Sequence, residues 1–137
     1  MFTSDNGENK MIYTTYFERI KDLPDNVVPI AICNGCLPEG LEHLRWYKKL
    51  GPKWSFFKIW KQTHDNDYYT KHFNQEVLGV LNPDKVVKEL NKFIRNYPID
   101  TSIALVCYEK PEDFCHRHLV ADWLTKAGYP VKEYEFN

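Results

Sequence analysis

The amino-acid sequence predicts a single α/β domain of three layers with a mostly parallel central sheet. Residues 27–33 (VVPIAIC) and 102–108 (SIALVCY) are nearly continuous apolar runs, typical of strands that are covered on both faces. From residue 83 to the C-terminus, helix and strand patterns alternate, and the segments between strands are long enough for parallel crossovers. We therefore expect these two strands to be interior, with helices beginning near residues 83 and 115 covering the sheet.

Length and composition are those of one folded domain. The chain has 137 residues, of which 43% are hydrophobic and 15% aromatic, and this composition argues against disorder. We expect residues 1–10 to be a frayed or disordered tail, because they lack apolar periodicity, and residues 11–137 to form the domain.

Charge and hydropathy limit the expected partners and compartment. The balance of 18 basic and 19 acidic residues gives no global attraction to nucleic acid or to a membrane surface. No apolar run approaches the roughly 20 residues of a spanning helix, and the polar N-terminus is unlike a signal peptide. We therefore expect a cytoplasmic protein with no membrane partner.

The N-terminal half shows strand patterns first and becomes less regular afterwards. Pro29 lies within the apolar run at 27–33 and slightly weakens the expectation of an interior strand, because proline lacks a backbone donor and prefers an edge. The expected elements are a strand at 11–17, a loop or short helix at 18–22, a strand at 27–33, a loop at 34–40, a helical turn at 41–49 and a strand or aromatic-rich loop at 53–62.

The C-terminal half has clearer boundaries. Asn82 and Pro83 form a helix start, with Asn82 as the N-cap and Pro83 in the first turn. Gly128 ends the last helix. The expected elements are helices at 68–78 and from 83 to about 97, a strand at 102–108, a helix at 115–127 and a half-exposed strand at 131–136.

The candidate site lies where the strand at 102–108 leads through an acidic turn into the helix that begins at Cys115. Free backbone N–H groups and the positive end of the helix dipole gather at such a start, so an anion or a thiolate is favoured there. Cys115 is followed at once by His116, Arg117 and His118. We expect Cys115 to be a nucleophile or a redox-active thiol, although a cysteine here could also simply pack.

The neighbouring residues suggest the remaining roles. His116 is the expected general acid or base, and Glu109 could orient a histidine or accept from a substrate. Arg117 is the expected anion clamp, unless it is only a surface or capping residue. The substrate would be a small anionic molecule such as a nucleotide, with Tyr108 on the rim and Tyr13 and Asn34 as walls. His118 is two residues from His116, so at most one of them should face the site.

A second motif, Cys33-Asn34-Gly35-Cys36, ends the strand at 27–33. A single Cys-x-x-Cys can be a redox pair, half of a zinc site or two ordinary thiols. Zinc would need two further ligands, which Cys115 and His116 or His118 could supply if the loops converge. We expect no metal and no cofactor, because Cys33 lies in an apolar strand and Cys36 beyond it.

The competing hypothesis is a non-catalytic binding module for nucleic acid or a protein partner. The aromatic and basic residues between Trp54 and Lys61 could stack on bases and hold phosphates. The alternative for this segment is a strand with one aromatic face in the core and lysines outside, which the neutral overall charge favours.

Three segments resemble the uncharacterised family known as domain of unknown function 488. They are Ile12-Tyr13-Thr14, the run from Cys107 to Pro111, and Cys115-His116-Arg117. The resemblance spans about residues 11–136 and implies a small cytoplasmic α/β protein, but no activity. Members commonly carry a Val-Asp-Val-Arg-type second strand, whereas this chain has Ile-Ala-Ile-Cys-Asn at residues 30–34, so its Cys-x-x-Cys is an addition.

Overall fold

The central sheet is parallel throughout the described part of the chain. The computed structural model describes residues 11–137, and the expected N-terminal tail, residues 1–10, lies outside them. The strand order is β3-β2-β4-β1-β5. The strands are β1 (Ile12–Tyr16), β2 (Val27–Ala31), β3 (Arg45–Trp46), β4 (Ser102–Cys107) and β5 (Val131–Glu133). The predicted α/β class and the interior positions of β2 and β4 are confirmed.

Helices occupy most of the rest of the chain. The α-helices are α1 (Trp54–Thr63), α2 (Asn66–Glu76), α3 (Pro83–Lys92) and α4 (His116–Lys126), and the 3-10 helices are η2 (Phe17–Asp22), η3 (Lys48–Leu50) and η4 (Leu78–Val80). Asn82 caps α3 as expected, since its side chain accepts from the backbone N–H of Lys85. Among the described residues, none of these helices is both long and apolar enough to cross a membrane.

Pro29 is tolerated in an interior strand because its neighbour on one side is very short. The backbone of Ala31 faces β3, where its carbonyl accepts from Tyr47, and that of Ile32 faces β4. Pro29 is two residues before Ala31, so its backbone also faces the side of β3. The strand β3, however, pairs only with Ile30 and Ala31. No described strand residue lies opposite Pro29 on that side, so the sheet loses no hydrogen bond through its missing N–H.

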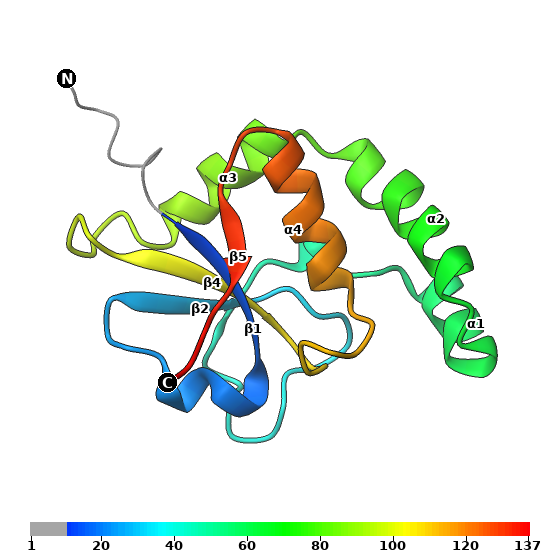
Figure 1. Cartoon of the computed structure of the whole chain (residues 1–137), viewed down its shortest axis with the longest axis horizontal. Coiled ribbons are helices and arrows are strands. Elements are labelled where there is room, and N and C mark those ends of the chain that lie inside the picture. The colour runs from blue at the N-terminus through cyan, green and yellow to red at the C-terminus, as the bar shows by residue number, and fades with distance from the viewer. Residues whose placement is uncertain (1–10) are drawn as a thin grey trace.

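The two faces of the sheet are covered differently. Ile30 and Leu105 point into a core that all four α-helices share, through residues such as Phe56, Phe73, Leu90 and Leu124. Ala31 and Val106 point to the opposite face, which Phe17 of η2 and leucines of the 34–44 loop cover. Figure 1 shows the four α-helices gathered on one side of the strands, with η2 (blue) away from them. The second covering layer is thus a 3-10 helix and a loop, where we expected α-helices.

Two element predictions were wrong. Residues 53–62 form α1 instead of a strand or loop, because Phe56 and Trp60, four residues apart, lie on one helix face that packs inward. Residues 41–49 hold the short strand β3, not only a helical turn. Two further boundaries differ by three residues or more: the α-helix from residue 83 ends at Lys92 and the last strand at Glu133.

Candidate functional site

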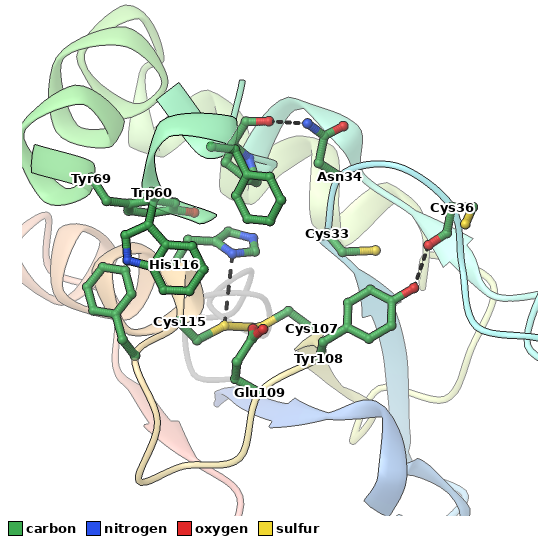
Figure 2. A pocket seen from close by; sticks show the side chains of 13 residues that line it. Cys33, Asn34, Cys36, Trp60, Tyr69, Cys107, Tyr108, Glu109, Cys115 and His116 are labelled. Atoms are coloured by element: carbon green, nitrogen blue, oxygen red, sulfur yellow. Dashed lines mark hydrogen bonds between the residues drawn. A yellow bond between two sulfur atoms is a disulfide. The ribbon is translucent and has the colours of Figure 1, made fainter. Parts of the chain in front are cut away.

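A cavity of about 230 Å³ lies at the carboxyl ends of β2 and β4, between α1, α2 and the start of α4 (Figure 2). This is where open parallel sheets bind their ligands. The side chains around it come from loops and elements that are far apart in sequence. They are Cys33, Asn34, Cys36, Pro52, Phe57, Trp60, Tyr69, Cys107, Tyr108, Glu109, Phe114, Cys115 and His116.

A disulfide joins Cys107 to Cys115 on the wall of this cavity. Cys107 is the last residue of β4, and Cys115 is the N-cap of α4, eight positions later. Both residues are buried. The disulfide therefore links the end of β4 directly to the start of α4, the two places where the sequence analysis expected the site. Sequence reasoning gave Cys107 no chemical role, although both strand-end position and spacing to Cys115 were visible.

His116 is fixed between a backbone carbonyl and the sulfur of Cys115. Its Nε2 lies 2.7 Å from the carbonyl oxygen of Ile32, and its Nδ1 lies 3.9 Å from the Sγ of Cys115. Since a carbonyl only accepts, Nε2 must carry the hydrogen, and a neutral ring then presents the lone pair of Nδ1 to the sulfur. Burial lowers the pKa of His116 to about 4, so the ring is neutral near pH 7.

Glu109 brings a carboxyl group to the same cavity. Figure 2 shows its side chain beside the disulfide. Burial raises the pKa of Glu109, which favours its protonated form more than in water. Burial also raises the pKa of the Tyr69 hydroxyl, with a smaller contribution from the charge of Glu109. Glu109 can therefore act as an acid or a hydrogen-bond partner for a bound molecule, in agreement with its expected place in the site.

Aromatic rings form the opposite wall. Phe114 lies with its ring centroid 5.1 Å from that of Tyr69 and 5.8 Å from that of Trp60, and Phe57 lies 6.0 Å from Trp60. None of the residues that line the cavity is a lysine or an arginine. Sequence reasoning missed these rings as site residues, because the segment of Phe57 and Trp60 was expected to be a strand or loop.

Arg117, the expected anion clamp, lies behind the cavity and does not line it. Its side chain is 0% exposed, and its Nε and Nη2 donate to the carboxylate of Glu133 over 3.1 and 3.0 Å. Nη1 donates to the carbonyl oxygen of Glu109 over 2.5 Å and to the Sγ of Cys107 over 3.3 Å. These bonds engage four of its five N–H donors with the protein itself.

The remaining predicted residues divide between the cavity and other places. Tyr108 lines the cavity and donates its hydroxyl to the carbonyl oxygen of Cys36 over 2.6 Å. Asn34 also lines it and donates to the carbonyl of Pro52. Tyr13 does not, because its ring packs edge-on against Tyr134 at 4.9 Å. His118 is half-buried outside the lining, and burial lowers its pKa.

Cys33 and Cys36 are free thiols. Both border the cavity, but Cys33 is buried and its pKa is raised to about 11, whereas Cys36 is exposed. A neutral buried thiol such as that of Cys33 is a poor nucleophile at neutral pH. In the structure the two thiols of the Cys-x-x-Cys motif are not bonded to each other.

A different set of groups could hold a metal ion. Ligand atoms of Cys107, Cys115 and His116 all lie within 4.8 Å of one another, and the two sulfurs would be available once the disulfide is reduced. In the part of the chain that the structure describes, this cluster includes neither Cys33 nor Cys36, so the four-ligand set considered from the sequence is not assembled.

Comparison with protein-family models gives a match over most of the chain. The model of the family DUF488-N3a, described as the active DUF488-N3 subclade, matches residues 26–128. This range contains β2, β4, all four α-helices and every residue that lines the cavity. No curated protein and no solved structure matches the chain.

Proposed function

The chain belongs to the DUF488-N3a family, and on this premise we propose that it is a cytosolic thiol-dependent enzyme whose nucleophile is Cys115. The observation that carries the proposal is the orientation of His116, with Nε2–H held by Ile32 and Nδ1 facing Cys115. A nucleophile beside a base that a third group orients is the arrangement of covalent catalysis. The family description, an active subclade, agrees with an enzymatic role.

The disulfide makes reduction the first step. Two equivalents of a low-molecular-weight thiol would donate two electrons to the Cys107–Cys115 bond, giving two thiols and one external disulfide. In the cytosol, disulfides are usually transient and serve catalysis or redox sensing. The bond thus stores Cys115 in an unreactive form that a reducing cytosol would open.

Reduced Cys115 would then react through His116. Nδ1 accepts the thiol proton, and the thiolate Sγ forms a bond to an electrophilic carbon of the substrate. The leaving group departs with its electron pair and takes the proton from the imidazolium, which restores neutral His116, while Glu109, whose raised pKa favours its protonated form, donates a hydrogen bond to the substrate. Water, deprotonated by His116, releases the product and restores the thiol. The N-terminus of α4 stabilises the thiolate in the same place.

The lining indicates the substrate class. Five aromatic side chains and Glu109, with no lysine or arginine, favour a flat, neutral or cationic ring over a fully buried anion. A nucleotide-like molecule could place its base here, but its phosphates would stay outside. We therefore assign Arg117 a positioning role: it holds the backbone of Glu109 and the sulfur of Cys107 instead of a ligand.

Covalent labelling tests this function. The reduced protein is treated with N-benzyl-2-chloroacetamide or with 2-chloroacetamide, which share one electrophile, and labelling of each cysteine is followed by peptide mass spectrometry. We expect Cys115 to react at least ten times faster with the benzyl compound, while exposed Cys36 shows no such preference. Trp60→Leu should reduce the preference. Equal rates at Cys115, or no reaction there, would refute the proposal.

The cluster of Cys107, Cys115 and His116 favours a second candidate, a zinc site. A metal ion on these ligands would occupy both the thiolate and the base, and so would exclude the nucleophilic role of Cys115. Elemental analysis of protein purified without chelators separates the two candidates. One equivalent of zinc that disappears in Cys107→Ser would support the metal site.

A further inference from the structure

A second hollow, separate from the cavity at Cys115, lies beside the edge strand β3. Its volume is about 560 Å³, and it runs between the segment of β3 and η3 and the C-terminal end of α3. It shares no lining residue with the first cavity. Its lining consists of Trp46, Tyr47, Lys48, Lys49, Glu89, Lys92, Phe93 and Arg95. We call it the β3 groove.

Positive charge dominates the β3 groove. Four of its lining residues are cationic and one, Glu89, is acidic. Glu89 accepts from Tyr47 and from the Nζ of Lys49, 3.2 Å away, and these bonds lower its pKa, so it stays ionised and is paired with Lys49. The charges of Lys48, Lys92 and Arg95 are then in excess. In a chain whose net charge is −1, this local excess is a feature of the groove and not of the composition.

Aromatic rings alternate with these cations. The Nζ of Lys48 lies 4.3 Å from the ring centroid of Trp46. Outside the residues that line the groove, the guanidinium of Arg45 lies 5.3 Å from the ring centroid of Tyr97 and donates to its hydroxyl over 2.7 Å. Tyr97 is 36% exposed, which leaves part of its ring open to a ligand.

We propose that the β3 groove binds single-stranded nucleic acid. Lys48, Lys92 and Arg95 would contact successive phosphates, and Tyr97 with Trp46 would stack on unpaired bases. The aromatic rings favour a single strand over a duplex. The bases of a duplex already stack on one another, so they cannot stack on a protein ring. The sequence-based hypothesis placed a binding surface of this chemistry at Trp54–Lys61, but there Phe57 and Trp60 border the first cavity instead.

Fluorescence anisotropy with a labelled 12-nucleotide oligouridylate tests the proposal. We expect the logarithm of the association constant to fall with the logarithm of the salt concentration. The slope should be about −2, as for three phosphate contacts on a single strand. The double variant Lys92→Glu/Arg95→Glu should weaken binding more than tenfold. Lys58→Glu/Lys71→Glu has the same change in net charge outside the groove lining and should weaken it less than threefold.

Tyr97→Ala separates stacking from charge. It should weaken oligouridylate binding about fivefold or more without changing the salt slope, since stacking contributes roughly 1–3 kcal/mol per base. A 12-base-pair duplex should bind more weakly than the single strand. Equal losses in the two charge-reversal variants, tighter binding to the duplex, binding only to vesicles that contain phosphatidylserine, or no binding at 0.1 M salt would each overturn the proposal.

Discussion

His116 turns its Nδ1 atom toward the Sγ of Cys115, at 3.9 Å, because its other ring nitrogen donates to the carbonyl of Ile32. The carbonyl belongs to the residue that follows β2, and Cys115 begins α4. The sheet and the helix therefore fix the tautomer of the ring as well as its direction. The neutral ring directs the lone pair of Nδ1 at the sulfur, and a thiolate formed there would raise the pKa of His116 again, because the opposite charges stabilise each other.

The buried ring should make folding stability depend on pH. In the folded protein the pKa of His116 is about 4, whereas in the unfolded chain it is about 6.5, so the unfolded state binds more protons between these values. The free energy of unfolding should therefore fall by about 3 kcal/mol as pH drops from 7 to 4. Urea titrations at several pH values measure it. His116→Gln should lose this part of the pH dependence, and an unchanged profile would contradict the assignment.

The disulfide should stabilise the fold as well as store the thiol. Closing a loop of eight residues lowers the conformational entropy of the unfolded chain, which stabilises the folded state by about 2–3 kcal/mol. We expect reduction with dithiothreitol to lower the free energy of unfolding by this amount. Cys107→Ser, which lacks the bond, should show no response to reductant. A response that persists in this variant would place the reducible bond elsewhere.

Arg117 should matter for stability through its partners. Replacing it with methionine keeps most of its volume but leaves Glu133 and the carbonyl of Glu109 without their donor. We expect a loss of about 3 kcal/mol, the usual cost of breaking a buried pair. Glu133→Gln should cost less, because that side chain is partly exposed and still accepts from Thr14. Urea unfolding of both variants and of the double variant gives the coupling between them.

Much of the fold followed from local patterns. The continuous apolar runs identified β2 and β4 as interior strands, and the Asn82-Pro83 pair marked the start of α3. The segment of α1 was misread because aromatic residues have high strand propensity, and only packing against α2 decides for the helix. The thin covering layer of η2 and the 34–44 loop depends on contacts that no local pattern encodes.

The candidate site was visible in sequence only where its residues are adjacent. Cys115, His116 and Glu109 lie close together along the chain, and the structure brings them to one cavity. Trp60 and Tyr69 reach that cavity from distant helices, so their part in it required the tertiary arrangement. Arg117 was assigned to the site because it follows Cys115 and His116 in sequence. Helix geometry instead turns its side chain toward Glu133, on β5.

The pH dependence of Cys115 alkylation tests the central claim most directly. In the reduced Cys36→Ser variant, which removes the exposed thiol, reaction with iodoacetamide is followed by peptide mass spectrometry from pH 5 to 10. The proposed Cys115–His116 pair predicts an apparent pKa for Cys115 below the free-thiol value of about 8.5, and a rise toward or above that value in His116→Gln. A pKa at or above 8.5 in both proteins would contradict an activated nucleophile.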